Sequence, residues 1–152
     1  MNGHATDLLE LAIRPTLAAL DMGGEAAERQ MLGTALAESG GTALRQRGGG
    51  PALGLWQMEP ATHDDIWDDF LAHRHDMGRR VLEAGLCSDR STDALAWNLR
   101  YACAMARVHY WRVPAAIPDA LEDQARYWKR HYNTSAGKGT VEHYLDAWRS
   151  AA

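Results

Sequence analysis

The residue of this chain best suited to acid–base chemistry is Glu38, in the segment TALAESGG (residues 34–41). The preceding positions 31, 32, 35 and 36 are apolar and Ala37 adds no polar cover, so the Glu38 carboxyl group is expected to be partly desolvated. Desolvation raises the pKa of a carboxyl group and keeps its proton on near neutral pH, as a general acid requires. A solvated surface glutamate is the alternative, because carboxylates are frequent on helices.

A glycine-rich segment follows Glu38. Residues 40–59 hold six glycines and one proline and show no helical period, which predicts a loop or a short irregular hairpin. The part RGGGPALG lacks the Gly-Lys-Ser/Thr ending of a phosphate-binding loop and follows no predicted strand. Its end, GLWQME (residues 54–59), combines glycine, tryptophan, glutamine and methionine. That composition favours a surface shaped to hold a ligand.

Three short segments stand in a fixed order around this loop. They are Glu38-Ser39, then Gly54-Leu55-Trp56-Gln57 with Pro60 and Thr62, then Tyr132-Asn133 with Gly137. Together they resemble the E-S pair, the G-L-M-Q-x-x-P-x-T segment and the A-Y-N-A-G segment of lytic transglycosylases of the lysozyme superfamily. The resemblance covers about residues 28–137, and IRPTLAAL leading into LGTALAESGG is similar to small phage-encoded members.

The resemblance implies a mechanism for Glu38. Glu38 would protonate the glycosidic oxygen between N-acetylmuramic acid and N-acetylglucosamine. It would then act as base on the muramic 6-hydroxyl, which closes onto the anomeric carbon and leaves a 1,6-anhydro end. Substrate-assisted chemistry avoids the second carboxylate that ordinary glycosidases use. The implied partner is the peptidoglycan glycan strand, with other virion proteins as further candidates, and neither a cofactor nor a metal is expected.

The resemblance also implies roles for residues near Glu38. The Tyr132 hydroxyl would orient the Glu38 carboxyl group, and the Gln57 amide would line the sugar cleft. Gly54 would let the backbone approach the substrate, and Trp56, in place of the usual Met, would offer a stacking face. The expected substrate-binding residues are Ser39, Gly54, Leu55, Trp56, Gln57, Met58, Glu59, Tyr132 and Asn133. From the residues alone, Tyr132 could instead be a core aromatic and Asn133 a helix end.

The sequence departs from the family pattern in ways that leave the reaction open. Glu59 stands where an apolar residue is common, so a second carboxylate is expected near the cleft. His131 precedes Tyr132 in place of Ala, two extra residues precede Gly137, and residues 48–54 lack a serine common in the family. A lysozyme-type hydrolase and a catalytically silent structural or wall-binding virion module therefore remain as alternatives.

The elements that would position these residues are helices throughout. The patterns predict helices from Asp7 onward with a kink or new turn at Pro15, over 25–39, from a cap at Thr62, over 76–84, from Ser91 or Thr92 to before Pro114, over 118–132 and from a cap at Thr140. NTSAGKG (residues 133–139) breaks the last two. The prediction is an all-α chain, a single lysozyme-like helical domain over residues 1–152 with a Gly-rich active-site loop.

Composition excludes several other classes of protein. The 152 residues, 46% hydrophobic and 24% charged, suit one globular domain. The net charge of −4 and scattered basic residues disfavour a nucleic-acid partner, and no apolar run is long enough for membrane insertion. His73 and His75 lack partners for a metal set, and Cys87 and Cys103 are expected to be reduced.

The N-terminal text bears on where the protein acts. MNGHATDLLELAIRP has no basic region followed by an apolar stretch, so no secretory signal is expected. A phage protein of this kind would be made in the host cytoplasm. It would reach the wall by lysis, through a holin-type pore, or as part of a virion.

Overall fold

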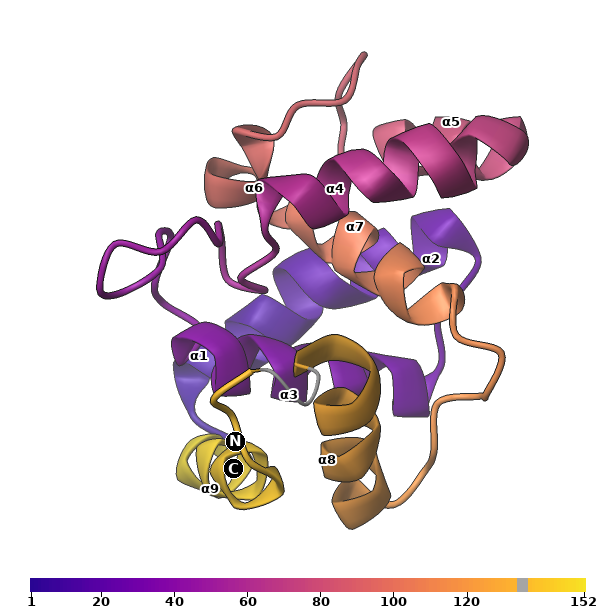
Figure 1. Cartoon of the computed structure of the whole chain (residues 1–152). Coiled ribbons are helices and arrows are strands. Elements are labelled where there is room, and N and C mark those ends of the chain that lie inside the picture. The colour runs from indigo at the N-terminus through magenta and orange to yellow at the C-terminus, as the bar shows by residue number, and fades with distance from the viewer. Residues whose placement is uncertain (134–136) are drawn as a thin grey trace.

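The computed structural model describes residues 1–133 and 137–152, and the predicted all-α class is confirmed (Figure 1). The elements are α1 (Gly3–Asp7), η1 (Leu8–Ile13), α2 (Arg14–Leu20), α3 (Glu25–Ser39), α4 (Pro60–Asp65), η2 (Ile66–Phe70), η3 (Leu71–His73), α5 (His75–Ala84), α6 (Ala94–Trp97), α7 (Leu99–Trp111), α8 (Leu121–Trp128), η4 (Lys129–Asn133) and α9 (Val141–Ala151). Within the described ranges, β-pairing is limited to isolated bridges in the loop after α3. None of the described helices combines the length and apolar composition needed to cross a membrane.

Helix α3 is the central element, because η1, α7, α8 and α9 all pack against it. Most of its side chains are buried. Its closest neighbour is α9: a Cβ atom at Gly33 would collide with the hydroxyl group of Tyr144. The two chain ends lie side by side, where the backbone N–H of Asn2 donates to the carbonyl of Ala151 at 2.6 Å (Figure 1). Helix α3 therefore has almost no free face, and its last turn carries Glu38 to the edge of the core.

The predicted bounds of α3 are confirmed, whereas the predicted start of the first helix is wrong. The helix ends at Ser39 because Gly40 adopts the left-handed conformation, with φ of 65°, that a glycine C-cap allows. The first helix begins at Gly3, since the side chain of Asn2 caps it by accepting from the N–H of Ala5 at 2.8 Å. Pro15 lies in the first turn of α2, directly after the π-helical segment η1, and the helical run continues through it.

Thr62 does not cap α4, contrary to the sequence prediction. The helix begins at Pro60, and Glu59 occupies the N-cap position with an extended backbone (φ −74°, ψ 146°). Proline suits the first helical position, because its fixed φ is already helical. Thr62 therefore lies inside the helix, and Asp64 and Asp65 stand near its end rather than at its N-terminus.

Other differences arise from local capping and exposure. The helix predicted from about residue 91 is split into α6 and α7, because the Asn98 side chain caps α7 by accepting from the N–H of Tyr101. The cap at Thr140 is confirmed by a bond from the N–H of His143. Trp97 and Trp111 are exposed, although tryptophan side chains are usually largely buried. Residues 134–136 of the predicted break lie outside the described residues.

Candidate functional site

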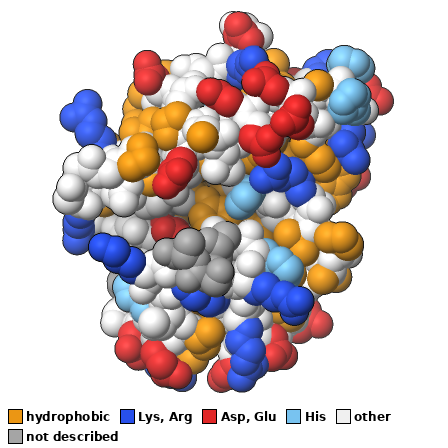
Figure 2. Space-filling view, in the orientation of Figure 1, with side chains coloured by type: hydrophobic (Ala, Val, Ile, Leu, Met, Phe, Trp, Pro, Cys, Tyr) orange, Lys and Arg blue, Asp and Glu red, His pale blue; other side chains and the backbone are white. Residues whose placement is uncertain are grey.

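A cleft of about 880 Å³ lies between the end of α3, the loop at residues 40–59, α4, η4 and the start of α9. Figure 2 shows the hollow in the middle of the face seen in Figure 1, with acidic side chains gathered above it over α4 and η2. Its lining includes these sequence-predicted residues: Glu38, Ser39, Gln57, Met58, Glu59, Tyr132 and Asn133. Three other predicted residues, Gly54, Leu55 and Trp56, do not line it. The structure thus brings together the first and third of the predicted segments and part of the second.

Glu38 lies on the wall of this cleft, one residue before the end of α3. The indole N–H of Trp128 donates to its Oε1 at 3.1 Å. Burial raises the pKa of Glu38 from an ordinary value of 4.5 to about 7, against hydrogen bonds from Trp128 and Asn133 and the charges of His143 and Lys129. At neutral pH the neutral and the charged forms of Glu38 therefore coexist. One side chain can then both donate and accept a proton.

Trp128 is a site residue that is not among the residues predicted from the sequence. The ring is buried, in a small cluster with Ala37 and Tyr144, but its N–H points to Glu38. The sequence could have suggested this contact, because a buried tryptophan needs an acceptor for its indole N–H. Trp128 also stands four residues before Tyr132, so the two share one face of the helical segment.

Tyr132 makes a different contact from the one expected. Its hydroxyl group donates to the backbone carbonyl of Trp56 at 2.6 Å, and its ring lies against the rings of His109 and Tyr110. The bond joins η4 to the loop at residues 40–59. Burial and then the nearby Glu38 charge raise the Tyr132 pKa well above its ordinary value, so the hydroxyl stays protonated. Tyr132 therefore holds η4 against the loop, and its hydroxyl proton goes to Trp56 in place of Glu38.

We expect Tyr132→Phe to lower the free energy of unfolding by about 1 kcal/mol, because it removes one buried hydrogen bond. The measurement is chemical denaturation at fixed pH. Tyr127→Phe is a matched control, since its hydroxyl donates to the carbonyl of Ala115 at 2.9 Å, and Ala115 does not line the cleft. It should cost a similar amount. A loss in the Tyr127 variant beside unchanged stability in the Tyr132 variant would contradict the bond to Trp56.

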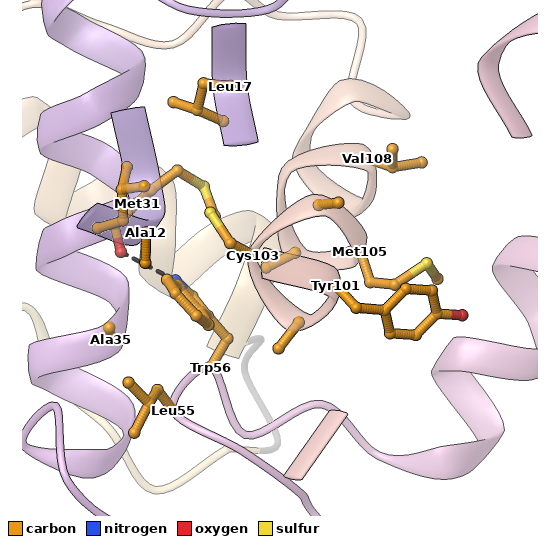
Figure 3. Close-up of a cluster of buried hydrophobic side chains, with 14 of the residues drawn as sticks. Ala12, Leu17, Met31, Ala35, Leu55, Trp56, Tyr101, Cys103, Met105 and Val108 are labelled. Carbon is orange, nitrogen blue, oxygen red and sulfur yellow. Dashed lines mark hydrogen bonds between the residues drawn. The ribbon is translucent and has the colours of Figure 1, made fainter. Parts of the chain in front are cut away.

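The prediction that Trp56 offers a stacking face for a sugar is wrong. Its side chain is only 1% exposed and its indole N–H donates to the carbonyl of Met31 at 3.0 Å (Figure 3). Leu55 is buried as well, and both side chains fill the core beside α3. Gly54 is required for a different reason from the one predicted: with φ of +78°, a Cβ there would collide with the carbonyl oxygen of Leu95. Its close approach is to backbone and not to a ligand.

Ser39, Gln57 and Met58 shape the cleft in different ways. The Ser39 hydroxyl donates to the carbonyl of Leu55 at 2.7 Å, so it fastens the loop to α3. The Gln57 amide nitrogen donates to the carbonyl of Gly54 at 2.9 Å, which leaves the amide oxygen as the group that can accept from a ligand. Met58 is buried and forms an apolar part of the wall. Of these three, Gln57 offers the polar contact.

Glu59 is exposed and lines the same cleft as Glu38. Its backbone is extended, as is usual for a residue before proline. The structure therefore places a second carboxylate in the cleft.

Basic side chains gather at the cleft, although they are scattered along the sequence. Arg47, Lys138 and His143 line it, and Lys129 lies behind the lining residues Asn133 and Gly137. His143 contacts the carbonyl of Ala37 through its Nε2 at 2.7 Å, and Lys129 donates to Asn133. Because these residues come from distant parts of the chain, only the fold reveals the cluster. It offers positive charge to any anion formed or bound beside Glu38.

The described residues contain no group of three or more His, Cys, Asp or Glu side chains arranged to hold a metal ion. Comparisons with models of known families, with characterised proteins and with solved structures found no match for this chain. The function must therefore be inferred from the site itself.

Proposed function

We propose that this protein cleaves the β-1,4 glycosidic bond between N-acetylmuramic acid and N-acetylglucosamine in peptidoglycan. The observation that carries the proposal is the partly buried Glu38 carboxyl group, with its pKa raised to about 7, on the wall of an open cleft. The order of Glu38-Ser39, the Gln57 segment and Tyr132-Asn133, which resembles lytic transglycosylases, supports the choice of substrate. The resemblance to small phage-encoded members supports a phage protein that reaches the wall by lysis or within a virion.

In the proposed reaction, neutral Glu38 first donates its proton to the glycosidic oxygen as the bond to the anomeric carbon breaks. The departing sugar keeps that proton on its new 4-hydroxyl group. The Glu38 carboxylate then accepts the proton of the muramic 6-hydroxyl as that oxygen bonds to the anomeric carbon. The N–H of Trp128, 3.1 Å from Oε1, stabilises the carboxylate between the two steps. A pKa of about 7 serves both steps, because a group near the working pH both donates and accepts readily.

A lysozyme-type hydrolase is the second candidate, because Glu59 lines the same cleft. In that case Glu59 would activate water or stabilise the oxocarbenium-like transition state. The product would then be a reducing sugar in place of the 1,6-anhydro sugar. The exposure of Glu59 and its place at the N-cap of α4 favour the transglycosylase.

The deciding experiment is incubation with purified peptidoglycan, followed by mass analysis of the released muramic ends. The expected result is anhydro ends from the wild type and from Glu59→Gln. Hydrated ends from the wild type, with activity lost in Glu59→Gln, would establish the hydrolase. If the wild type releases no fragments while folded, the cleavage proposal fails and a catalytically silent module replaces it.

The pH dependence of cleavage gives a further prediction. The first step needs the protonated form of Glu38, so we expect the rate to fall as the pH rises through about 7. The measurement is the initial rate on soluble glycan strands at constant ionic strength. A carboxyl group with an ordinary pKa would instead lose its proton near 4.5, and a rate that had already declined there would rule out Glu38 as the acid.

A further inference from the structure

Lys129 makes two hydrogen bonds beside the cleft. Its ammonium group donates to the Asn133 side-chain oxygen at 3.0 Å and to the carbonyl of Gly137 at 3.0 Å. An ammonium group has only donors, so the end of the Asn133 amide that faces it must be the oxygen. The amide nitrogen of Asn133 therefore lies at the other end, away from Lys129.

The amide of Asn133 is also confined from its sides. A Cβ atom at Gly137 would collide with the carbonyl and the side chain of Asn133. A Cβ atom at Gly139 would lie 3.0 Å from the Asn133 amide nitrogen and would collide with the ring of Trp128. Two glycines thus leave just enough room for the amide. The slot restricts its position, and Lys129 decides which end points outward.

Asn133 and Glu38 line the same cleft, and the free end of the amide is its nitrogen, because Lys129 occupies the oxygen. A hydrogen bond from Asn133 lowers the pKa of Glu38, in opposition to the larger effect of burial. Only the nitrogen end of the amide can stabilise the carboxylate in this way, because the oxygen end would repel it. The orientation of one amide therefore controls how readily Glu38 holds its proton.

We propose that Lys129 is a positioning residue of the Glu38 site: by binding the Asn133 side-chain oxygen, it turns the amide nitrogen toward the carboxyl group. Lys129 then acts through Asn133 in addition to its own positive charge. The consequence for catalysis rests on the proposed function, whereas the effect on the proton affinity of Glu38 does not. Loss of Lys129 frees the amide to rotate, and Glu38 becomes harder to deprotonate.

Other titratable or charged groups also surround Glu38. His143 comes from α9, Tyr132 from η4 and His109 from α7. Arg47, Glu59 and Lys138 line the same cleft. Of the cationic groups, His143 and Lys129 act on the Glu38 pKa, and both lower it. Lys138 lines the cleft and is not among the groups that shift the Glu38 pKa, so removing it gives a matched control for the loss of one lysine charge.

The test is a direct titration of the Glu38 side-chain carboxyl carbon by NMR in the folded protein. We expect Lys129→Met to raise the Glu38 pKa by about 1 relative to wild type, the usual scale for losing a close opposite charge and a hydrogen bond. Lys138→Met should leave it close to the wild-type value. Lys129→Arg keeps the charge and can donate to the same oxygen. The Glu38 pKa in this variant should therefore stay close to the wild-type value.

The double variant separates positioning from simple charge. If Lys129 acts through Asn133, Lys129→Met must raise the Glu38 pKa less in an Asn133→Ala background than in the wild type. Equal effects in the two backgrounds would overturn the proposal and leave Lys129 as a plain charge. An effect of Lys129→Met no larger than that of Lys138→Met would also overturn it. A wild type that cleaves no peptidoglycan, with the expected titrations unchanged, would defeat only the proposed function.

Discussion

Replacing Glu38 by glutamine is expected to lower the rate of peptidoglycan cleavage by a factor of about 100 or more, the usual scale for general acid catalysis. Glutamine has nearly the same shape as glutamate, and its side-chain oxygen can still accept from the indole N–H of Trp128. It cannot deliver a proton to the glycosidic oxygen. The measurement is the initial rate of muropeptide release by the purified variant. A variant that degrades peptidoglycan at the wild-type rate would remove Glu38 from the mechanism.

The same substitution, Glu38→Gln, should make the folded protein more stable than the wild type at alkaline pH. Folding raises the pKa of Glu38 from 4.5 to about 7, so the folded state keeps a proton in that window that the unfolded state has lost. This contribution to stability is complete below pH 4.5 and is lost as the pH rises through 7. Glutamine does not titrate. At about pH 8, Glu38→Gln should therefore exceed the wild type by about 3 kcal/mol in free energy of unfolding.

The combination of lost activity and gained stability excludes unfolding as the cause of inactivity. Denaturation curves of both proteins at about pH 4 and about pH 8 provide the measurement. The difference between them should grow with pH. A constant difference would indicate that the Glu38 pKa is close to its ordinary value in the folded protein.

Replacing Gly54 by alanine should give the largest loss of stability, about 3 to 5 kcal/mol. The backbone at Gly54 has φ of +78°, which is costly for any L-residue with a side chain, and a Cβ would meet the carbonyl oxygen of Leu95. That oxygen is backbone and cannot move aside cheaply. Equilibrium denaturation would measure the change.

Gly48→Ala is the matched control for Gly54→Ala. Gly48 has a similar φ of +86°, but a Cβ there would have no neighbour within 4 Å. It should therefore cost only the backbone strain, about 1 to 2 kcal/mol. If the two variants lose the same stability, the packing of Gly54 against Leu95 is not what requires glycine.

Helical periodicity was sufficient to predict the fold class and much of the helix order. The bounds of α3 were predicted in full, because an apolar run is followed by glycines that suit a left-handed cap. Capping was harder to read. The side chains of Asn2 and Asn98 cap α1 and α7, and Glu59 stands at the N-cap of α4 directly before Pro60, so each start depends on a local contact that the periodicity does not reveal.

The partial burial of Glu38 was predicted from the sequence, but the side chain that binds its carboxyl group was not. Glu38 can be recognised in the sequence because it follows a run of apolar residues. The indole N–H that binds it belongs to Trp128, which is 90 residues further along the chain. The prediction for residues 54–56 was wrong for a similar reason. The glycine and aromatic content of this segment fits a binding loop and a loop folded into the core equally well, and only the structure shows Trp56 against Met31.

The loop at residues 40–59 is fastened to the rest of the protein at several points. Ser39 holds the carbonyl of Leu55, Tyr132 holds that of Trp56, and the Trp56 ring is itself buried beside α3. Gln57 and Met58 follow directly in the chain, so the same contacts hold them in place. A ligand then meets a wall already in its final shape, so little conformational entropy is lost on binding. The affinity of a ligand for this wall should therefore depend on how well its shape and polar groups match the wall of the unbound protein.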